Sequence, residues 1–419
     1  MEKSKIKFIC LLALLASVFS TLHLYADEPD NLATLIDEAV RNNPEIIASK
    51  NRYEAAKNKI PQASSLNNPE FEFKYDKINA SMDAVMEGDT APMRTYAVSQ
   101  DVPFLSKLLT RAQIAQKEAQ IAYSEYREKE RRIISSVKSL YSELAFVYKS
   151  IDITKENKLL LEQLASSASA QYSLGKTSQQ DALKAHVEIA RMDNELLMLE
   201  QKRQAKQARL DILLNKDPSF ELGPIASSGE TELKYTLDEL NKITLEKRPE
   251  LMASHLAVER AKKIYSLAKQ EYLPDFTVKY ESMERDGRLT DWAGMVGISI
   301  PLWFWQKESF NVSQMKNELK AMEAEYQDKK NTVLLEVKDA YSKAEAYKKL
   351  ATLYKTSFIP QAEQAFKSAS VGYEANTIDF LNLLDSQRTL LEFKLDYYMA
   401  TVEHEAALAE LEMAVGIDL

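Results

Sequence analysis

The sequence consists of two copies of one unit, and this repeat constrains the fold more than any local pattern. The tetrapeptide Asn-Pro-Glu-Ile at 43–46 recurs as Arg-Pro-Glu-Leu at 248–251, and the same spacing carries Pro69 onto Pro274. Later matches need small changes of spacing; they pair Val102 with Ile300, Pro103 with Pro301, Tyr141 with Tyr341, Tyr172 with Tyr373 and Leu183 with Leu384. Because the unit has roughly 200 residues, each element expected in one copy has a counterpart in the other.

Each copy contains a stretch in which apolar and polar residues alternate. In the second copy, residues 274–301 alternate on both sides of a polar tip at 284–288. The first copy has the same pattern at 69–103. Period-two alternation predicts β-hairpins, so we expect four strands of about 9–11 residues, the length of tilted membrane strands. The alternative is a small β-layer packed on the helices of a soluble protein.

The apolar residues of these strands are predicted to share one face that contacts lipid: Phe71, Phe73, Tyr75, Val98, Phe276, Val278, Tyr280, Val296, Ile298 and Ile300. A register error of one residue would turn all of them to the other face. Aromatic residues near the strand ends, at 104, 292 and 303–305, are typical of a bilayer interface. Since the smallest outer-membrane barrels have about eight strands, four strands predict an oligomer that shares one barrel.

Outside the hairpins the sequence predicts long helices, in keeping with only nine glycines in 419 residues. The first helix, 31–65, should break near Pro44. Residues 106–172 contain neither proline nor glycine, and their apolar residues recur at coiled-coil spacing. After a turn, a return helix is expected at 179–214, with an inner stripe of Leu183, Val187, Ala190 and Leu197. The second copy repeats this plan, and its additional Pro360 should kink the long helix.

These patterns divide the chain into a signal peptide at 1–26, a first repeat at 27–215, a connector at 216–235 and a second repeat at 236–419. The first repeat contains a β-hairpin at 69–103 and a helical hairpin at 104–214 whose tip is 172–178. The second contains a β-hairpin at 274–301 and a helical hairpin at 305–415 whose tip is 373–379.

The N-terminal residues predict export. Three lysines precede an apolar run at 8–19, and the small residue Ala26 follows, which indicates a secretory signal peptide cleaved near Ala26. A short membrane anchor is the alternative, but a spanning helix needs roughly 20 apolar residues. Cys10, the chain's single cysteine, lies in this run without a lipidation motif, so no lipid anchor is expected. Cleavage would remove a net charge of +2 and take the formal charge from −9 to −11, which argues against nucleic acid as a partner.

No pattern in the sequence predicts an enzyme, a cofactor or a metal site. His186, His255 and His404 each lack a second histidine or cysteine at ligand spacing. A cluster of Met82, Met86 and Met93 suggests a soft-metal site, but ordinary loop methionines are the better interpretation.

The turns between the long helices are the candidate functional positions. Tyr172 stands three residues before Gly175, and Tyr373 stands three residues before Asn376. Glycine and asparagine suit the left-handed backbone at a helix end. A turn alone does not explain the two tyrosines, nor the acids that follow, Asp181 and Asp385.

Together these features resemble the TolC-type outer-membrane efflux factor family. The resemblance rests on the tandem repeat, the Pro-Glu pairs at 44–45 and 249–250, the prolines that open and close the strands, and the two turns. It implies a mainly α protein with a small membrane β part, a homotrimer with a 12-stranded β-barrel in the outer membrane and a 12-helix α-barrel in the periplasm. It also implies two partners: a periplasmic adaptor (membrane fusion) protein and an inner-membrane pump of the resistance-nodulation-division type.

The resemblance also implies a gate at the periplasmic tip. By motif, Asp181 and Tyr373 match a linked pair, and Asp385 matches an acid that lines the closed entrance. Ile378 stands where some relatives have an arginine, and Asn382 where they have a second acid. The gate in this chain is therefore expected to rely on fewer charges.

The expected function is a passive exit duct that catalyses no reaction. Its acidic balance favours cations in a lumen, and the family's metal-efflux branch is similarly compact, so heavy-metal cations are the first expected cargo and drugs the second. Two alternatives stay open: a duct for type I protein secretion, and a periplasmic coiled-coil scaffold or adaptor without a pore.

Overall fold

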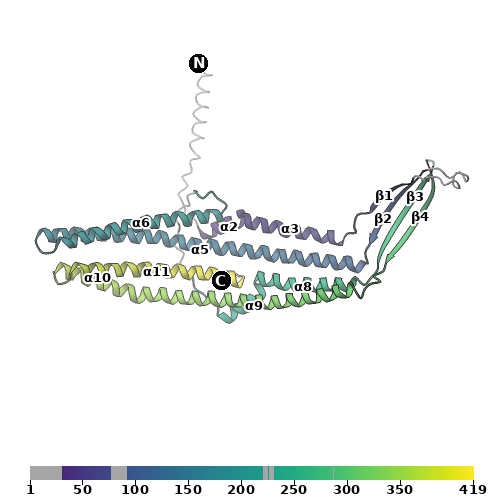
Figure 1. Ribbon diagram of the computed structural model, residues 1–419. Helices are drawn as coiled ribbons and strands as arrows, with labels where there is room; N and C mark the ends of the chain where they lie inside the picture. The colour runs from purple at the N-terminus through teal and green to yellow at the C-terminus, as the bar shows by residue number, and fades with distance from the viewer. Residues whose placement is uncertain (1–30, 77–91, 220–224, 226–230, 286) are drawn as a thin grey trace, which may run out of the picture. The chain divides into compact units, whose positions relative to one another are not determined.

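The computed structural model describes residues 31–76, 92–219, 225, 231–285 and 287–419 (Figure 1). The expected signal peptide, Met82 and Met86 lie outside the described residues. The chain forms two compact units, each drawn from three separate segments. Unit 1 comprises Met1–Val40, Ser136–Glu232 and Glu345–Ala406, and unit 2 comprises Arg41–Ser135, Leu233–Ala344 and Ala407–Leu419. Each unit therefore contains residues of both copies of the repeat.

A four-stranded antiparallel sheet lies in unit 2, as the alternating stretches predict. Its strands follow chain order: β1 (Glu70–Asp76), β2 (Met93–Val102), β3 (Asp275–Arg285) and β4 (Arg288–Ser299). The central pairing of β2 with β3 joins the two copies and runs from Met93 opposite Arg285 to Val102 opposite Phe276. The sheet is thus a single surface built equally from both copies.

Helices make up most of the rest: α2 (Leu32–Asn42), α3 (Pro44–Ser64), α5 (Leu105–Ser173), α6 (Gln179–Leu213), α7 (Leu237–Lys247), α8 (Pro249–Gln270), α9 (Glu308–Leu353), the π-helix η1 (Tyr354–Phe358), α10 (Ile359–Glu374) and α11 (Phe380–Val415). The predicted class, mainly α with a small β part, is confirmed. α5 is one helix of 69 residues, because 106–172 contains no residue that would break it.

Prolines determine where the helices are interrupted. Asn43 and Arg248 adopt extended backbone before Pro44 and Pro249, because a proline ring disfavours helical geometry in the residue before it. Each proline then starts the next helix, where its missing N–H is no loss. The distortion expected at Pro360 is the π-turn of η1, in which the N–H of Ile359 donates to the carbonyl of Tyr354.

The core of unit 1 contains many alanines, which lets its helices approach closely. Its buried residues are Leu161, Ala165, Ala168, Ala182, Ala185, Met192, Ala369, Tyr373, Phe380, Leu383 and Leu384. The stripe predicted for α6 was wrong, since Leu183, Val187, Ala190 and Leu197 are exposed and Leu197 is 72% exposed. The buried face of α6 is instead marked by Ala182, Ala185, Met192 and Leu199, one position away from the predicted stripe at Leu183.

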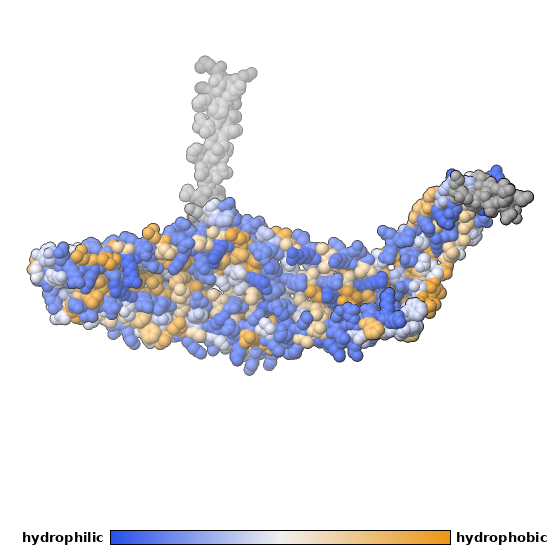
Figure 2. Space-filling model, in the orientation of Figure 1, coloured by the Kyte–Doolittle hydropathy of each residue, from blue (hydrophilic) through white to orange (hydrophobic). Residues whose placement is uncertain are grey.

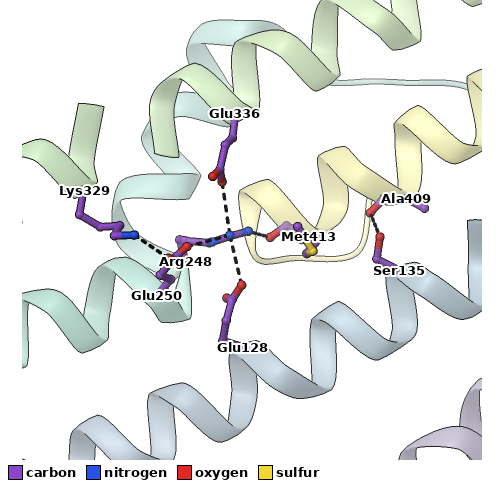
Figure 3. A network of polar contacts seen from close by, with 8 residues as sticks. All are labelled: Glu128, Ser135, Arg248, Glu250, Lys329, Glu336, Ala409 and Met413. Carbon is purple, nitrogen blue, oxygen red and sulfur yellow. Dashed lines mark hydrogen bonds and ion pairs between the residues drawn. The ribbon is translucent and has the colours of Figure 1, made fainter. Parts of the chain in front are cut away.

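A buried arginine organises unit 2 near the end of α11. The guanidinium of Arg248 lies 3.1 Å from carboxylate oxygens of both Glu128 and Glu250 and also donates to the carbonyl of Met413 (Figure 3). Glu336 lies on its other side, 3.5 Å away. A cation here stabilises the carboxyl end of α11, where carbonyl groups lack helical partners. Among the helices that the structure describes, none is both long and apolar enough to cross a membrane.

Candidate functional site: the sheet face and the helical-hairpin ends

One face of the sheet is exposed and largely apolar, with an ion pair of Arg94 and Glu284 near the turn of the second hairpin. Strand register places Phe71 opposite Val98 and Val98 opposite Tyr280, and it pairs Val278 with Val296. Directly opposed residues point to the same side of a sheet, as do alternate residues along each strand. The ten residues predicted to share a face therefore do so, with Ile300 continuing the alternation beyond β4. Val296 is 73% exposed, and Figure 2 shows apolar residues along the strands.

The opposite face of the sheet is polar and charged. Lys279 lies 3.1 Å from Glu72 on β1 and 2.6 Å from Glu281 on its own strand. The hydroxyl of Thr277 donates to Asp101 at 2.7 Å. These contacts all lie on one side, so the sheet separates an apolar surface from a charged one.

A buried lysine fixes the base of the sheet. Lys107, near the start of α5, donates to Asp275 at 2.9 Å and to the carbonyl of Leu273 at 3.0 Å. The backbone N–H of Phe104 donates to the same carboxylate at 2.9 Å. The first residue of β3 is thereby attached to the segment that follows β2. Lys107 was not identified from the sequence, where a lysine early in a helix carries no signal of burial.

Aromatic residues are exposed just beyond β4. The rings of Trp303 and Trp305 lie 5.6 Å apart, and those of Phe304 and Trp305 lie 5.2 Å apart. All three side chains are about half exposed or more. Tryptophan at the edge of an apolar strand surface is typical of a membrane interface.

The first helical hairpin turns at Gly175. Its φ of 69° is left-handed, and its N–H donates to the carbonyl of Tyr172 at 2.8 Å. The N–H of Lys176 donates to the carbonyl of Gln171 at 3.0 Å. These two bonds together form a helix end of the Schellman type. Ser178 then caps α6 through the N–H of Gln180.

The second helical hairpin turns in the same way at Asn376. This residue has a φ of 58°, and its N–H donates to the carbonyl of Tyr373 at 3.1 Å. Asp379 begins the next helix by accepting from the N–H of Asn382 at 3.0 Å. The side chain of Ile378 packs over Gly372, where a Cβ atom would stand only 2.6 Å from it.

The two tyrosines at these turns have different environments. Tyr172 is 46% exposed, whereas Tyr373 is 4% exposed and its ring lies 5.2 Å from Phe380. Burial raises the pKa of Tyr373, the charge of Asp181 raises it further, and the nearby Thr177 hydroxyl opposes this rise. Asp181 and Tyr373 of one chain therefore lie close enough for the carboxylate charge to affect the phenol, but they do not form a hydrogen bond with each other.

The remaining predicted residues of the turns lie on the surface. Asp385 and Asn376 are exposed, and Asp181 is half-buried. Burial raises the pKa of Asp181, and the nearby Asp379 adds to this effect while Lys184 opposes it. Within the described part of the chain, no group of three or more His, Cys, Asp or Glu side chains could hold a metal ion. Met93, the described member of the methionine cluster, is the first residue of β2.

Comparison with known proteins gives the family. A sequence profile described as "Outer membrane efflux protein" matches residues 35–216 and 240–417. The chain is 23% identical to the cobalt-zinc-cadmium resistance protein CzcC of Cupriavidus metallidurans over 93% of this chain and 90% of that protein. It is 19% identical to the outer membrane protein TolC of Vibrio cholerae over 92% of this chain and 91% of that protein.

A solved structure shares the fold. The outer membrane protein VceC of Vibrio cholerae superposes with a TM-score of 0.78 and 20% identity, covering 92% of this chain and 96% of that chain. The profile matches both halves of the chain and leaves a gap at the connector between them. The chain therefore belongs to the outer membrane efflux protein family, whose members are efflux channels of the outer membrane and not enzymes.

Proposed function

We propose that three copies of this chain form a passive duct through which heavy-metal cations leave the cell across the outer membrane. The observation that carries the proposal is the sheet, in which one exposed apolar face lies opposite one charged face. An apolar outer surface and a hydrated inner surface are what a membrane-spanning strand wall requires. The ten apolar residues from Phe71 to Ile300 would contact lipid.

The trimer follows from the edges of the sheet. Within one chain β1 and β4 each pair on one side only. Unpaired strand edges are unfavourable in lipid, where no water can satisfy their backbone groups. Four strands are too few to close on themselves, since barrels need about eight. Pairing β4 of one chain with β1 of the next closes a 12-strand wall from three chains, as the family resemblance implies.

Two observations favour metal cations as the cargo. The relative that matches 93% of the chain is named for resistance to cobalt, zinc and cadmium. The charged face of the sheet also carries more acids than bases, with Glu70, Glu72, Asp76, Asp101, Asp275, Glu281 and Asp291 against Lys74, Lys279, Arg285 and Arg288. A lumen with excess negative charge concentrates cations.

The partners are proposed from the same arrangement. The ends of the two helical hairpins, at 172–178 and 373–379, would meet a periplasmic adaptor protein, and an inner-membrane pump of the resistance-nodulation-division type would supply the energy. Export would follow cleavage near Ala26, without a lipid anchor. The repeats would be bounded at 27–215 and 236–419, with a connector at 216–235.

Deletion of the gene tests the proposal. The deletion strain should become sensitive to cobalt, zinc or cadmium salts and regain resistance when the wild-type chain is supplied. The chain should be found in the outer-membrane fraction as an oligomer that dissociates on heating. Unchanged metal resistance together with new sensitivity to lipophilic drugs would reject the cargo, and a soluble periplasmic monomer would reject the duct.

A further inference from the structure

A set of paired polar side chains lies beside the apolar cluster of unit 1. It comprises Asn157 on α5, Glu188 on α6, and Gln387 and Arg388 on α11; we call these four residues the polar layer. Asn157, Glu188 and Gln387 are buried, although alanine and leucine dominate the core beside them. Buried polar residues in helical bundles are uncommon because they must be paired, and they specify which helices associate and in what register.

The contacts in this layer link the two copies of the repeat. Arg388 holds Glu188 with two hydrogen bonds, one of them from Nε at 3.2 Å. The amide of Gln387 donates to the side-chain oxygen of Asn157. α11 of the second copy is thus joined to α5 and α6 of the first by a bidentate ion pair and an amide pair. The bond to Glu188 raises the pKa of Arg388, so the cation persists at any physiological pH.

The carboxylate of this ion pair is buried, whereas the guanidinium is partly exposed to solvent. The Glu188 side chain is 6% exposed, whereas that of Arg388 is 42% exposed. Separating α11 from α6 would leave the buried carboxylate with only Arg191 of its own helix, an exposed arginine 4.0 Å away that makes no hydrogen bond to it. That loss is less favourable than breaking an exposed pair. At the hairpin ends, in contrast, Ile378 supplies no charge.

We propose that the polar layer holds the second helical hairpin against the first in the closed duct, and that the Glu188–Arg388 pair must separate for the periplasmic end to open. This inference rests on the proposed duct and identifies what regulates its opening. It assigns the restraint to a layer set back from the hairpin ends. Ile378 and Asn382 provide no charged contact at the hairpin ends. The ion pair between α6 and α11 would hold the duct closed in their place.

Single-channel recording of the purified full-length protein in planar bilayers provides the test. Glu188→Gln keeps the size of the side chain and removes its charge, so the ratio of open to closed time should rise about tenfold or more, which corresponds to about 1.4 kcal/mol. The charge-reversed pair, Glu188→Arg with Arg388→Glu, should restore closure. Asp193→Asn is the matched control, because it removes one negative charge from α6 at an exposed pair with Lys158 that stays within the first hairpin.

The outcomes distinguish a failure of the proposed duct from a failure of the proposed polar layer. If neither the wild type nor Glu188→Gln ever conducts, the duct itself is rejected. A conducting wild type with an unchanged Glu188→Gln variant, or an Asp193→Asn variant that opens equally, would reject only the polar layer.

If Glu188→Gln fails to assemble, cross-linking gives an independent answer. Cys10 is the chain's single cysteine and lies in the expected signal peptide, so Glu188→Cys with Arg388→Cys can be joined selectively by a short thiol cross-linker. The cross-linked channel should remain closed and a mock-treated sample of the same variant should open. Equal conductance before and after cross-linking would overturn the proposal.

Discussion

Asn43 and Arg248 occupy the same position in the two copies, before Pro44 and Pro249, yet they stabilise the chain in different ways. Asn43 caps α3, because its side-chain oxygen accepts from the N–H of Glu45 at 2.9 Å. Arg248 makes no side-chain cap and instead gathers carboxylates and the carbonyl of Met413 at the end of α11. One position of the repeat therefore serves local helix initiation in the first copy and long-range attachment in the second.

Replacing Arg248 with Gln should destabilise the protein strongly. Glu128 would remain buried without its cation, and removing one partner of a buried pair costs about 3–5 kcal/mol. Burial already raises the pKa of Glu128, and Arg248 is the main group that opposes this rise. The measurement is thermal or denaturant unfolding of the purified protein. Lys329→Gln is the control, because its pair with Glu250 is partly exposed and should contribute less than about 1 kcal/mol; equal losses in the two variants would contradict this account.

Asp211 should make the protein less stable as pH rises. This side chain is 0% exposed, and among the described residues its carboxylate has no hydrogen-bond partner. Burial raises its pKa to about 6, well above the usual range of an aspartate. The folded state therefore binds the proton more tightly than the unfolded state, so the contribution of Asp211 to stability is fully present below about pH 4 and is lost as pH rises through about 6. We expect Asp211→Asn to stabilise the protein at pH 7.5 by about 1–3 kcal/mol and to give no gain at pH 4.

Asp217 offers a control of opposite sign. It is exposed, and its bonds from Ser219 lower its pKa. Asp217→Asn should therefore lose stability at neutral pH, where Asp211→Asn gains it. Unfolding curves from pH 4 to pH 7.5 measure both, and a gain for Asp211→Asn that does not depend on pH would show that its ionisation is not the cause.

The parts of the fold that local patterns determine are predictable from the sequence. The strands and the shared face of Phe71, Val278 and Val296 follow from period-two alternation, and the helix break follows from Pro44. The buried face of α6 could not be predicted in this way. The spacing of leucines indicates an apolar stripe but does not show which side of a helix packs inward. In α6 the alanines lie on the inward side, where they let the neighbouring helices approach more closely. The Glu188–Arg388 pair depends on α6 meeting α11 of the other copy, which no local pattern encodes.

Asp181 is expected to restrain the periplasmic end of the duct. Its carboxylate lies close enough to Tyr373 to raise the pKa of that buried phenol. Asp181→Ala should increase single-channel conductance, measured in planar bilayers. Asp193→Ala, an equal loss of charge farther along α6, should leave conductance unchanged. Identical conductance of Asp181→Ala and wild type would remove Asp181 from the gate.

Charge on the apolar face of the sheet should block membrane insertion. Val278 pairs with Val296 on that face, and an arginine at the bilayer midplane costs about 2–4 kcal/mol. Val278→Arg should therefore reduce the amount of heat-dissociable oligomer in the outer-membrane fraction. Thr277→Arg, one residue earlier and beside Asp101 on the charged face, should be tolerated. The reverse result would place the lipid on the other face of the sheet.

The two turns make a matched pair for a last prediction about the hairpin ends. Gly175 and Asn376 have φ values of 69° and 58°, a conformation that disfavours a Cβ atom by roughly 1–2 kcal/mol. Gly175→Ala should destabilise the first hairpin by about 1 kcal/mol, whereas Asn376→Gly should be neutral or slightly stabilising because glycine adopts this conformation freely. No Cβ contact interferes at Gly175, since no atom beyond the neighbouring residues lies within 4 Å of that place in the described structure. Hydrogen exchange at the two turns measures each effect locally, and a loss of protection in Asn376→Gly equal to that in Gly175→Ala would show that the asparagine side chain, and not the backbone angle, maintains the second turn.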